Sequence, residues 1–177
     1  MENIQILDKS FSIYLTEKEI TNKVTEMAHQ INETHKGEEI VVVGILNGCF
    51  MFASDLFKQL EIDCRISFLK LASYQGTHST GKIRQLIGLN EDIKGKTIII
   101  LEDIIDTGIT MEHIINQLKA YNPSDIKIAT LLFKPDAFQK DFHIDYTGFE
   151  IPDKFIVGYG LDYNGLGRNL RHIYQIS

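Results

Sequence analysis

Short runs of apolar, β-branched residues alternate along this chain with longer segments whose apolar residues recur at helical spacing. Two of the runs, residues 39–46 and 97–101, have too few polar positions for a strand with one exposed face. They predict strands that are buried on both faces, as in a parallel sheet. The same kind of pattern predicts four further strands, at residues 62–72, 82–89, 126–133 and 155–160.

Three segments between these strands predict helices. The first begins after Thr16, which with Glu19 has the spacing of a capping box, and continues to about residue 37. Its apolar positions share one face of a helix: Ile20, Val24, Met27 and Ile31. The other helices are predicted at residues 50–60 and 111–121. Strands that alternate with helices indicate an α/β fold with a mostly parallel central sheet.

The strand at 97–101 is followed by two acids, Glu102 and Asp103, and then by the loop 106–110, Asp-Thr-Gly-Ile-Thr. Open α/β sheets bind ligands at the carboxyl ends of their strands, so we expect a binding site here. Loop amides and a helix N-terminus favour phosphate, and Thr107 and Thr110 add hydroxyl donors. The acids can accept hydrogen bonds from a sugar diol or hold a hard divalent cation. A phosphorylated sugar with magnesium fits this pattern.

A simpler interpretation is a helix N-cap after a core strand, since Asp and Thr are common capping residues. Capping uses one such residue and leaves Glu102 and Asp103 unexplained. Other nucleotide motifs fail: Tyr163 stands where the dinucleotide fingerprint that starts at Gly158 needs its third glycine, and the chain has no P-loop sequence.

Residues 98–110 match throughout the signature of the phosphoribosyltransferases of the type I fold: four apolar residues, two acids, two apolar residues, then Asp-Thr-Gly-x-Thr. Within that family, residues 41–168 resemble the hypoxanthine-guanine group in particular. The matching positions are Leu46-Asn47-Gly48, Ser73-Tyr74, Lys134, residues 151–164 and Arg168.

The resemblance implies one phosphoribosyltransferase domain over residues 1–177. It would have a mostly parallel sheet flanked by helices, a small hood made from the N- and C-terminal segments, and a flexible lid at about 73–82 that begins with Ser73 and Tyr74. The implied activity transfers the 5-phosphoribosyl group of 5-phosphoribosyl 1-diphosphate (PRPP) to N9 of hypoxanthine, and also of guanine. The products would be IMP or GMP and pyrophosphate, in purine salvage. Members of the family generally form homodimers or homotetramers.

The resemblance also implies roles for single residues. Asp106 would be the general base, facing N7 of the purine. The purine would be held by Lys134, which donates to its 6-oxo group, by Phe155, Ile156 and Asp162. The ribose and 5′-phosphate of PRPP would be bound by Glu102, Asp103, Asp106, Thr107, Gly108, Ile109 and Thr110. Pyrophosphate would be bound by Leu46, Asn47, Gly48 and Arg168, and Mg²⁺ by Glu102, Asp103 and Asp162.

Several of these side chains have ordinary structural alternatives. Lys134 and Arg168 could be solvated surface cations, and Phe155 and Ile156 could be core residues of an apolar strand. Two positions depart from the family pattern, because Asn47 and Ile109 stand where some relatives carry lysine. The pyrophosphate and 5′-phosphate sites would then rely more on main-chain amides. Relatives often have a cis peptide bond between the residues that match Leu46 and Asn47.

Composition narrows the functional classes. The 177 residues fit one domain, and 44% hydrophobic and 24% charged residues are ordinary for a globular protein. No apolar stretch is long enough to span a bilayer and the start lacks a signal-peptide pattern, so we expect a cytoplasmic protein. The formal net charge of −6 argues against broad nucleic-acid binding. The alternative function is a phosphoribosyltransferase-fold regulator that senses a ligand and binds RNA, because a fold alone does not fix function.

Overall fold

The computed structural model describes residues 3–73 and 83–177. The predicted lid lies outside these ranges apart from Ser73, the last residue of a strand, so Tyr74 is not described. The elements within them are β1 (Asn3–Ile6), β2 (Lys9–Leu15), α1 (Glu17–Thr34), β3 (Ile40–Leu46), α2 (Phe50–Phe57), β4 (Cys64–Ser73), β5 (Ile83–Ile87), β6 (Thr97–Ile105), α3 (Ile109–Lys119), β7 (Asp125–Phe133), β8 (Tyr146–Glu150), β9 (Ile156–Val157) and β10 (Ile173–Ile176).

The main sheet has six strands in the order β5-β4-β3-β6-β7-β8. The neighbours from β4 to β8 are all parallel, and β5 adds an antiparallel edge. The two most apolar runs of the sequence, β3 and β6, pair at the centre, with Ile40 opposite Thr97 and Gly44 opposite Leu101. The predicted α/β fold with a mostly parallel central sheet is confirmed.

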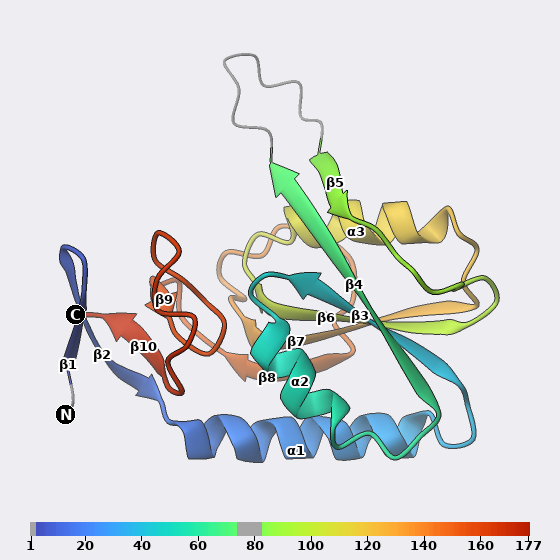
Figure 1. The fold of residues 1–177 in the computed structure, drawn as a ribbon, viewed down its shortest axis with the longest axis horizontal. Helices are drawn as coiled ribbons and strands as arrows, with labels where there is room; N and C mark the ends of the chain where they lie inside the picture. Colours follow the sequence, from blue (N-terminus) through green and yellow to red (C-terminus); the bar gives the residue numbers. More distant parts are fainter. Residues whose placement is uncertain (1–2, 74–82) are drawn as a thin grey trace.

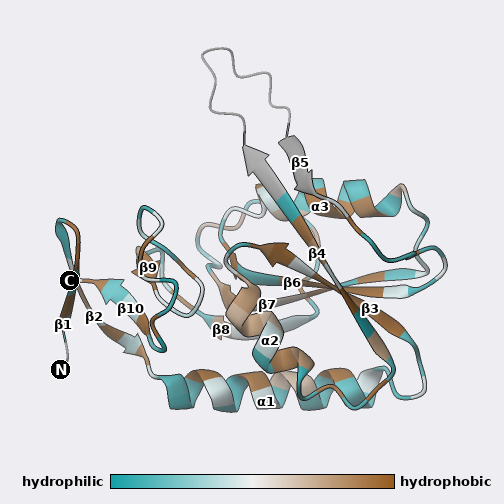
Figure 2. Ribbon diagram, viewed as in Figure 1, coloured by the Kyte–Doolittle hydropathy of each residue, from teal (hydrophilic) through white to brown (hydrophobic). Residues whose placement is uncertain are grey.

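Alternate residues of the central strands enter two separate cores. Val42 and Ile99 belong to a core with the inward face of α1 and with α2. Their neighbours Val43 and Ile98 belong to a second core with α3. Figure 1 shows α1 and α2 on one side of the sheet and α3 on the other. Figure 2 shows hydrophobic residues along much of α2 and β3, and both polar and hydrophobic residues along α1. The sheet is therefore covered on both faces, as its apolar strands predicted.

A second, antiparallel sheet is built from the first and last strands, in the order β1-β2-β10-β9. We call it the hood sheet; it carries both ends of the described chain (Figure 1). The strand predicted at 155–160 was too long, because only Ile156–Val157 forms β9, and Gly158 and Gly160 follow with φ of 106° and 101°. Sequence patterns did not predict β1, β2, β8 or β10, which are short and mix polar with apolar residues.

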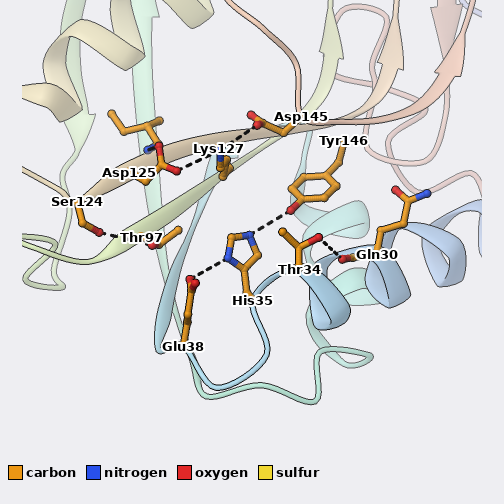
Figure 3. Close-up of polar contacts among 11 residues, drawn as sticks. Gln30, Thr34, His35, Glu38, Thr97, Ser124, Asp125, Lys127, Asp145 and Tyr146 are labelled. Atoms are coloured by element: carbon orange, nitrogen blue, oxygen red, sulfur yellow. Dashed lines mark hydrogen bonds and ion pairs between the residues drawn. The ribbon is translucent and has the colours of Figure 1, made fainter.

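The predicted start of α1 is confirmed, because Glu19 N donates to Thr16 Oγ1 and Thr16 N donates to Glu19 Oε2. The helix ends at Thr34, three residues before the predicted end. There the ring of His35 is buried, with Nδ1 3.0 Å from Glu38 Oε2 and Nε2 3.1 Å from the hydroxyl of Tyr146 on β8 (Figure 3). This contact fixes the end of α1 against the amino edge of the sheet.

Two boundaries matter for the site. The strand expected to end at 101 continues through Glu102 and Asp103 to Ile105, because β7 offers partners in register: Glu102 lies opposite Thr130 and Ile105 opposite Phe133. The helix α3 begins at Ile109, two residues earlier than expected. Among the described helices, none is long and apolar enough to cross a membrane.

The contact between His35 and Tyr146 should contribute to stability. We expect His35→Ala to lower the free energy of unfolding by about 1–3 kcal/mol, because it leaves the hydroxyl of the buried Tyr146 with one partner fewer. Urea unfolding measures the change. His29→Ala is the matched control, since His29 lies on the same helix but is exposed. An equal effect of both substitutions would contradict this role of His35.

Candidate functional site

Of the two acids near the end of β6, Asp103 is buried, and Glu102 is partly buried with one oxygen enclosed. Asp103 is 8% exposed, and Oε2 of Glu102 is buried with no hydrogen-bond partner among the described residues. Burial raises the pKa of Asp103 to about 6, against opposing main-chain hydrogen bonds and the charge of Arg168. Burial, and then the charge of Asp103, raises the pKa of Glu102 well above its usual value. A buried polar oxygen without a partner is costly, so this pair is suited to a ligand that supplies hydroxyl groups or positive charge.

The loop between β3 and α2 packs directly on the acids. The Leu46–Asn47 peptide bond, whose conformation the sequence left open, is cis. A side chain at Gly48 would collide with the carboxylate of Asp103. Asn47 is exposed and the loop main chain turns back on itself, with Phe50 N donating to the carbonyl of Asn47. Only glycine at position 48 allows the loop to come this close to β6.

The loop 106–110 joins the end of β6 to α3. Gly108 has φ of 80° and forms the N-cap, while Ile109 is 46% exposed. Together with Glu102 the loop lines a cavity of about 100 Å³. Its outer side is supported by the segment after β7, because Gln139 N donates to the carbonyl of Thr107 and Phe138 packs on Gly108. A loop that leads into a helix N-terminus in this way is a typical binding site for phosphate groups.

Lys134, at the end of β7, is 7% exposed and is not a solvated surface lysine. Its Nζ donates to Asp153 Oδ1 at 2.8 Å and to Asp106 Oδ2 at 3.3 Å. Burial alone would lower the pKa of Lys134, but the hydrogen bonds and charges of Asp153 and Asp106 outweigh it and raise that pKa. Lys134 is therefore a charged donor beside Asp106.

The segment that follows β9 reaches across to the loop between β3 and α2. A side chain at Gly160 would collide with the carbonyl oxygen of Gly48. Arg168 Nη1 donates to the Gly160 carbonyl at 2.6 Å and Nη2 lies 2.5 Å from Asp162 Oδ1. Phe155 is 43% exposed, although its ring contacts Tyr163 edge to face, whereas Ile156 is buried. Of the two apolar residues, only Phe155 presents a surface on which a ligand could stack.

The predicted magnesium ligands do not form a ready protein cage. Within residues 3–73 and 83–177, no group of three or more His, Cys, Asp or Glu side chains is placed to hold a metal ion. Glu102 and Asp103 are nevertheless hard oxygen donors, and Asp162 is near enough to raise the pKa of Asp103. This donor set fits Mg²⁺, which commonly binds one or two carboxylates and takes its other ligands from substrate phosphates and water.

Most sequence-predicted residues meet at the carboxyl edge of the main sheet. The structure adds three residues to which the sequence assigned no role, although two of them, Asp153 and Tyr159, lie in the stretch 151–164 that resembles the family. Asp153 bonds to Lys134, Tyr159 donates to Asp55 Oδ2 at 2.7 Å, and Phe138 packs on Gly108. Each pairing joins segments that are 19 to 104 residues apart or depends on loop packing. No local sequence pattern marks such contacts.

A larger groove, about 600 Å³, lies at the opposite edge of the sheet, by the amino end of β7 and the segment before β8. The charge of Lys127 is already paired there, since its Nζ lies 3.1 Å from Asp125 and 3.3 Å from Asp145 (Figure 3). The unpartnered acid oxygen, the helix N-terminus and the buried lysine are all at the carboxyl edge. The candidate site is therefore at the carboxyl edge and not at the larger groove.

Comparison with protein-family models matches residues 10–164 to the phosphoribosyl transferase domain. The chain is 39% identical over 175 residues to a hypoxanthine-guanine phosphoribosyltransferase of Aquifex aeolicus, with 98% of each chain covered. It is 41% identical over 162 residues to one of Staphylococcus aureus, covering 91% of this chain and 90% of the relative. The crystal structure of a hypoxanthine-guanine phosphoribosyltransferase from Bacillus anthracis has a TM-score of 0.87 at 38% identity, with 94% of this chain and 96% of that chain covered.

These relatives span nearly the whole chain, and the family model spans both the acid pair and the loop 106–110. The fold and the comparisons therefore agree. This chain belongs to the phosphoribosyltransferase family.

Proposed function

We propose that this enzyme transfers the 5-phosphoribosyl group of PRPP to N9 of hypoxanthine, and also of guanine, in purine salvage. The observation that carries the proposal is the acid pair with its buried, unpartnered Glu102 Oε2, placed directly before a phosphate-type loop. The two curated relatives compared above, which are named for the same activity, support it. The products are IMP or GMP and pyrophosphate.

PRPP has three parts that match three parts of the site. The ribose hydroxyls donate to Glu102 and Asp103, which supplies the partner that Glu102 Oε2 otherwise lacks. The loop 106–110 receives the 5′-phosphate through its amides and through the hydroxyls of Thr107 and Thr110. Pyrophosphate lies against Leu46-Asn47-Gly48 and Arg168, whose planar fork has further donors besides those used by Asp162 and Gly160.

The purine occupies the space between Phe155 and the Asp106–Lys134 pair. Lys134 donates to the 6-oxo group, which favours hypoxanthine and guanine over adenine, because the 6-amino group of adenine is itself a donor there. Phe155 stacks on the ring, and main-chain groups at Ile156 and Asp162 contact its edge. As the bond between N9 and C1′ forms and the bond from C1′ to pyrophosphate breaks, Asp106 accepts the proton that the purine releases.

Mg²⁺ is the metal that we propose for this site, held by Glu102, Asp103 or Asp162 together with oxygens of PRPP. When bound, it supplies positive charge that neutralises the leaving pyrophosphate. The chain's own residues do the rest: they orient the two substrates, and they place preorganised charge where it develops. At the beginning of the predicted lid, Ser73 and Tyr74 would help to exclude water, which competes with the purine for the activated ribose.

Location and assembly belong to the same proposal. We place the enzyme in the cytoplasm, since PRPP, the nucleotide products and pyrophosphate are charged and do not cross a bilayer. We expect a homodimer or homotetramer, as in the family. Sedimentation equilibrium distinguishes these assemblies from a monomer.

Activity tests the proposal directly. With PRPP and Mg²⁺ we expect turnover of hypoxanthine, then guanine, then xanthine, and none of adenine. Asp106→Asn should lower kcat by about 10²- to 10⁴-fold, because it removes the general base without changing the shape of the side chain. Asp136→Asn, at an exposed carboxylate, is the control. If no base is turned over although PRPP binds, the enzyme interpretation fails and a ligand-sensing role takes its place.

The acid pair should cost stability when no ligand is bound. Between pH 4 and pH 6 the folded protein holds a proton on Asp103 that the unfolded chain has lost, so the free energy of unfolding falls as pH rises through this window. At pH 7 the ionised Asp103 should cost roughly 2–3 kcal/mol. We therefore expect Asp103→Asn to be more stable than the wild type at pH 7 and to lose that advantage near pH 4.5, measured by urea unfolding. A difference that does not vary with pH would contradict this account.

A further inference from the structure

Lys134 has two carboxylate partners, and the shorter contact is not with the general base. Its Nζ lies 2.8 Å from Asp153 Oδ1 and 3.3 Å from Asp106 Oδ2. Asp153 lies just before β9, and its side chain is 65% exposed, while that of Lys134 is 9% exposed. A solvated carboxylate thus reaches in to a buried ammonium group. An ordinary surface ion pair has two exposed partners and contributes little, so this pair calls for a different explanation.

The main chain fixes the three side chains relative to one another. Lys134 N donates to the carbonyl of Ile105, the residue before Asp106, at 3.0 Å. Ile151 N donates to the carbonyl of Phe133, the residue before Lys134, at 2.8 Å. Ile151 is buried and lies two residues before Asp153. Both carboxylates are therefore anchored to the same end of β7, on either side of the lysine.

The two carboxylates cannot keep the same role during the reaction. Lys134 contacts only Oδ2 of Asp106, and once Asp106 accepts a proton from the purine its carboxylate is neutral and no longer places a negative charge beside Lys134. Lys134 is nearly buried, and a buried ammonium group that loses a partner is destabilised in its charged form. Its three protons can serve the 6-oxo group, Asp153 and Asp106 at once, but only Asp153 has no competing task.

We infer that Asp153 is a positioning residue for purine recognition: it keeps Lys134 charged and directed toward the 6-oxo group while Asp106 acts as the base. The inference rests on the proposed function. The Lys134–Asp153 contact also joins the end of β7 in the main sheet to the segment that carries Phe155. With the Ile151–Phe133 main-chain hydrogen bond, this contact holds together the donor to the 6-oxo group and the stacking surface.

Steady-state kinetics of Asp153→Asn test the inference. We expect KM for hypoxanthine to rise about tenfold or more, since a charge-assisted hydrogen bond that orients Lys134 is lost. KM for PRPP should stay within about twofold, because the acid pair and the loop 106–110 are untouched. Unsubstituted purine, which has no 6-oxo group, should inhibit the variant and the wild type equally. Asp153→Glu should recover part of the affinity for hypoxanthine.

Two controls separate positioning from a merely structural role. Asp136→Asn removes an exposed carboxylate two residues after Lys134 and should leave both KM values unchanged. Circular dichroism and a thermal melt check that Asp153→Asn folds, which we expect because the side chain is mostly exposed. If that variant fails to fold, Asp153→Glu is compared with the wild type instead. The quantity compared is then the ratio of the KM for hypoxanthine to the KM for PRPP.

The outcomes are distinct. A selective rise of KM for hypoxanthine supports the inference. An unchanged KM for hypoxanthine overturns the inference and leaves the proposed function intact. So does an equal rise of the KM for hypoxanthine, the KM for PRPP and the inhibition constant of purine. A wild-type enzyme that neither binds nor turns over hypoxanthine overturns the proposed function and this inference with it.

Discussion

The site depends on a close backbone contact between three segments that are far apart in the sequence. The main chain at Gly160 lies against the carbonyl of Gly48, and Gly48 lies against the carboxylate of Asp103. A side chain at either glycine would separate the segments. This contact joins the acids at the end of β6, the loop after β3 and the segment after β9. The proposed pyrophosphate, ribose and purine sites can form one continuous cleft only if these segments touch.

The electrostatics follow from that packing. Gly48 covers Asp103, so burial raises the pKa of a carboxyl group that would otherwise ionise freely. Arg168 is drawn to the same place by Asp162 and by the carbonyl of Gly160. The resulting site has charges arranged before any ligand arrives, at some cost to the stability of the free protein. Such preorganisation is what catalysis by positioning and charge requires.

The parts of the site that are contiguous in the chain could be predicted from the sequence. Glu102, Asp103 and the loop 106–110 fall within nine residues, and the apolar run before them already indicated a buried strand. The end of that strand was misplaced, because the register with β7 carries it to Ile105. The β-propensity of Glu102 and Asp103 could not show this pairing, because the partner residues on β7 lie 28 positions further along the chain, as Thr130 does from Glu102.

For residues whose roles depend on tertiary contacts, the sequence left the role undecided or did not show it. The sequence could not tell whether Lys134 is a surface or a buried lysine, because that depends on Asp153 and on the end of β6. The hood sheet was not predicted for a similar reason: only β9 falls within a predicted strand, and the pair β2–β10 that completes the sheet joins the two ends of the chain. The resemblance to the family implied a hood from both termini without showing its strands. Local patterns thus predicted the core strands and the phosphate-type loop, and long-range packing completed the rest.

Binding of PRPP with Mg²⁺ to Gly160→Ala, measured by titration calorimetry, tests the close contact most directly. Gly165→Ala is the matched control, because Gly165 also has a positive φ, of 84°, but a side chain there would meet open space. We predict that Gly160→Ala weakens PRPP binding by about tenfold or more, and that Gly165→Ala leaves it nearly unchanged. Equal affinity of both variants for PRPP would show that the site does not depend on this contact.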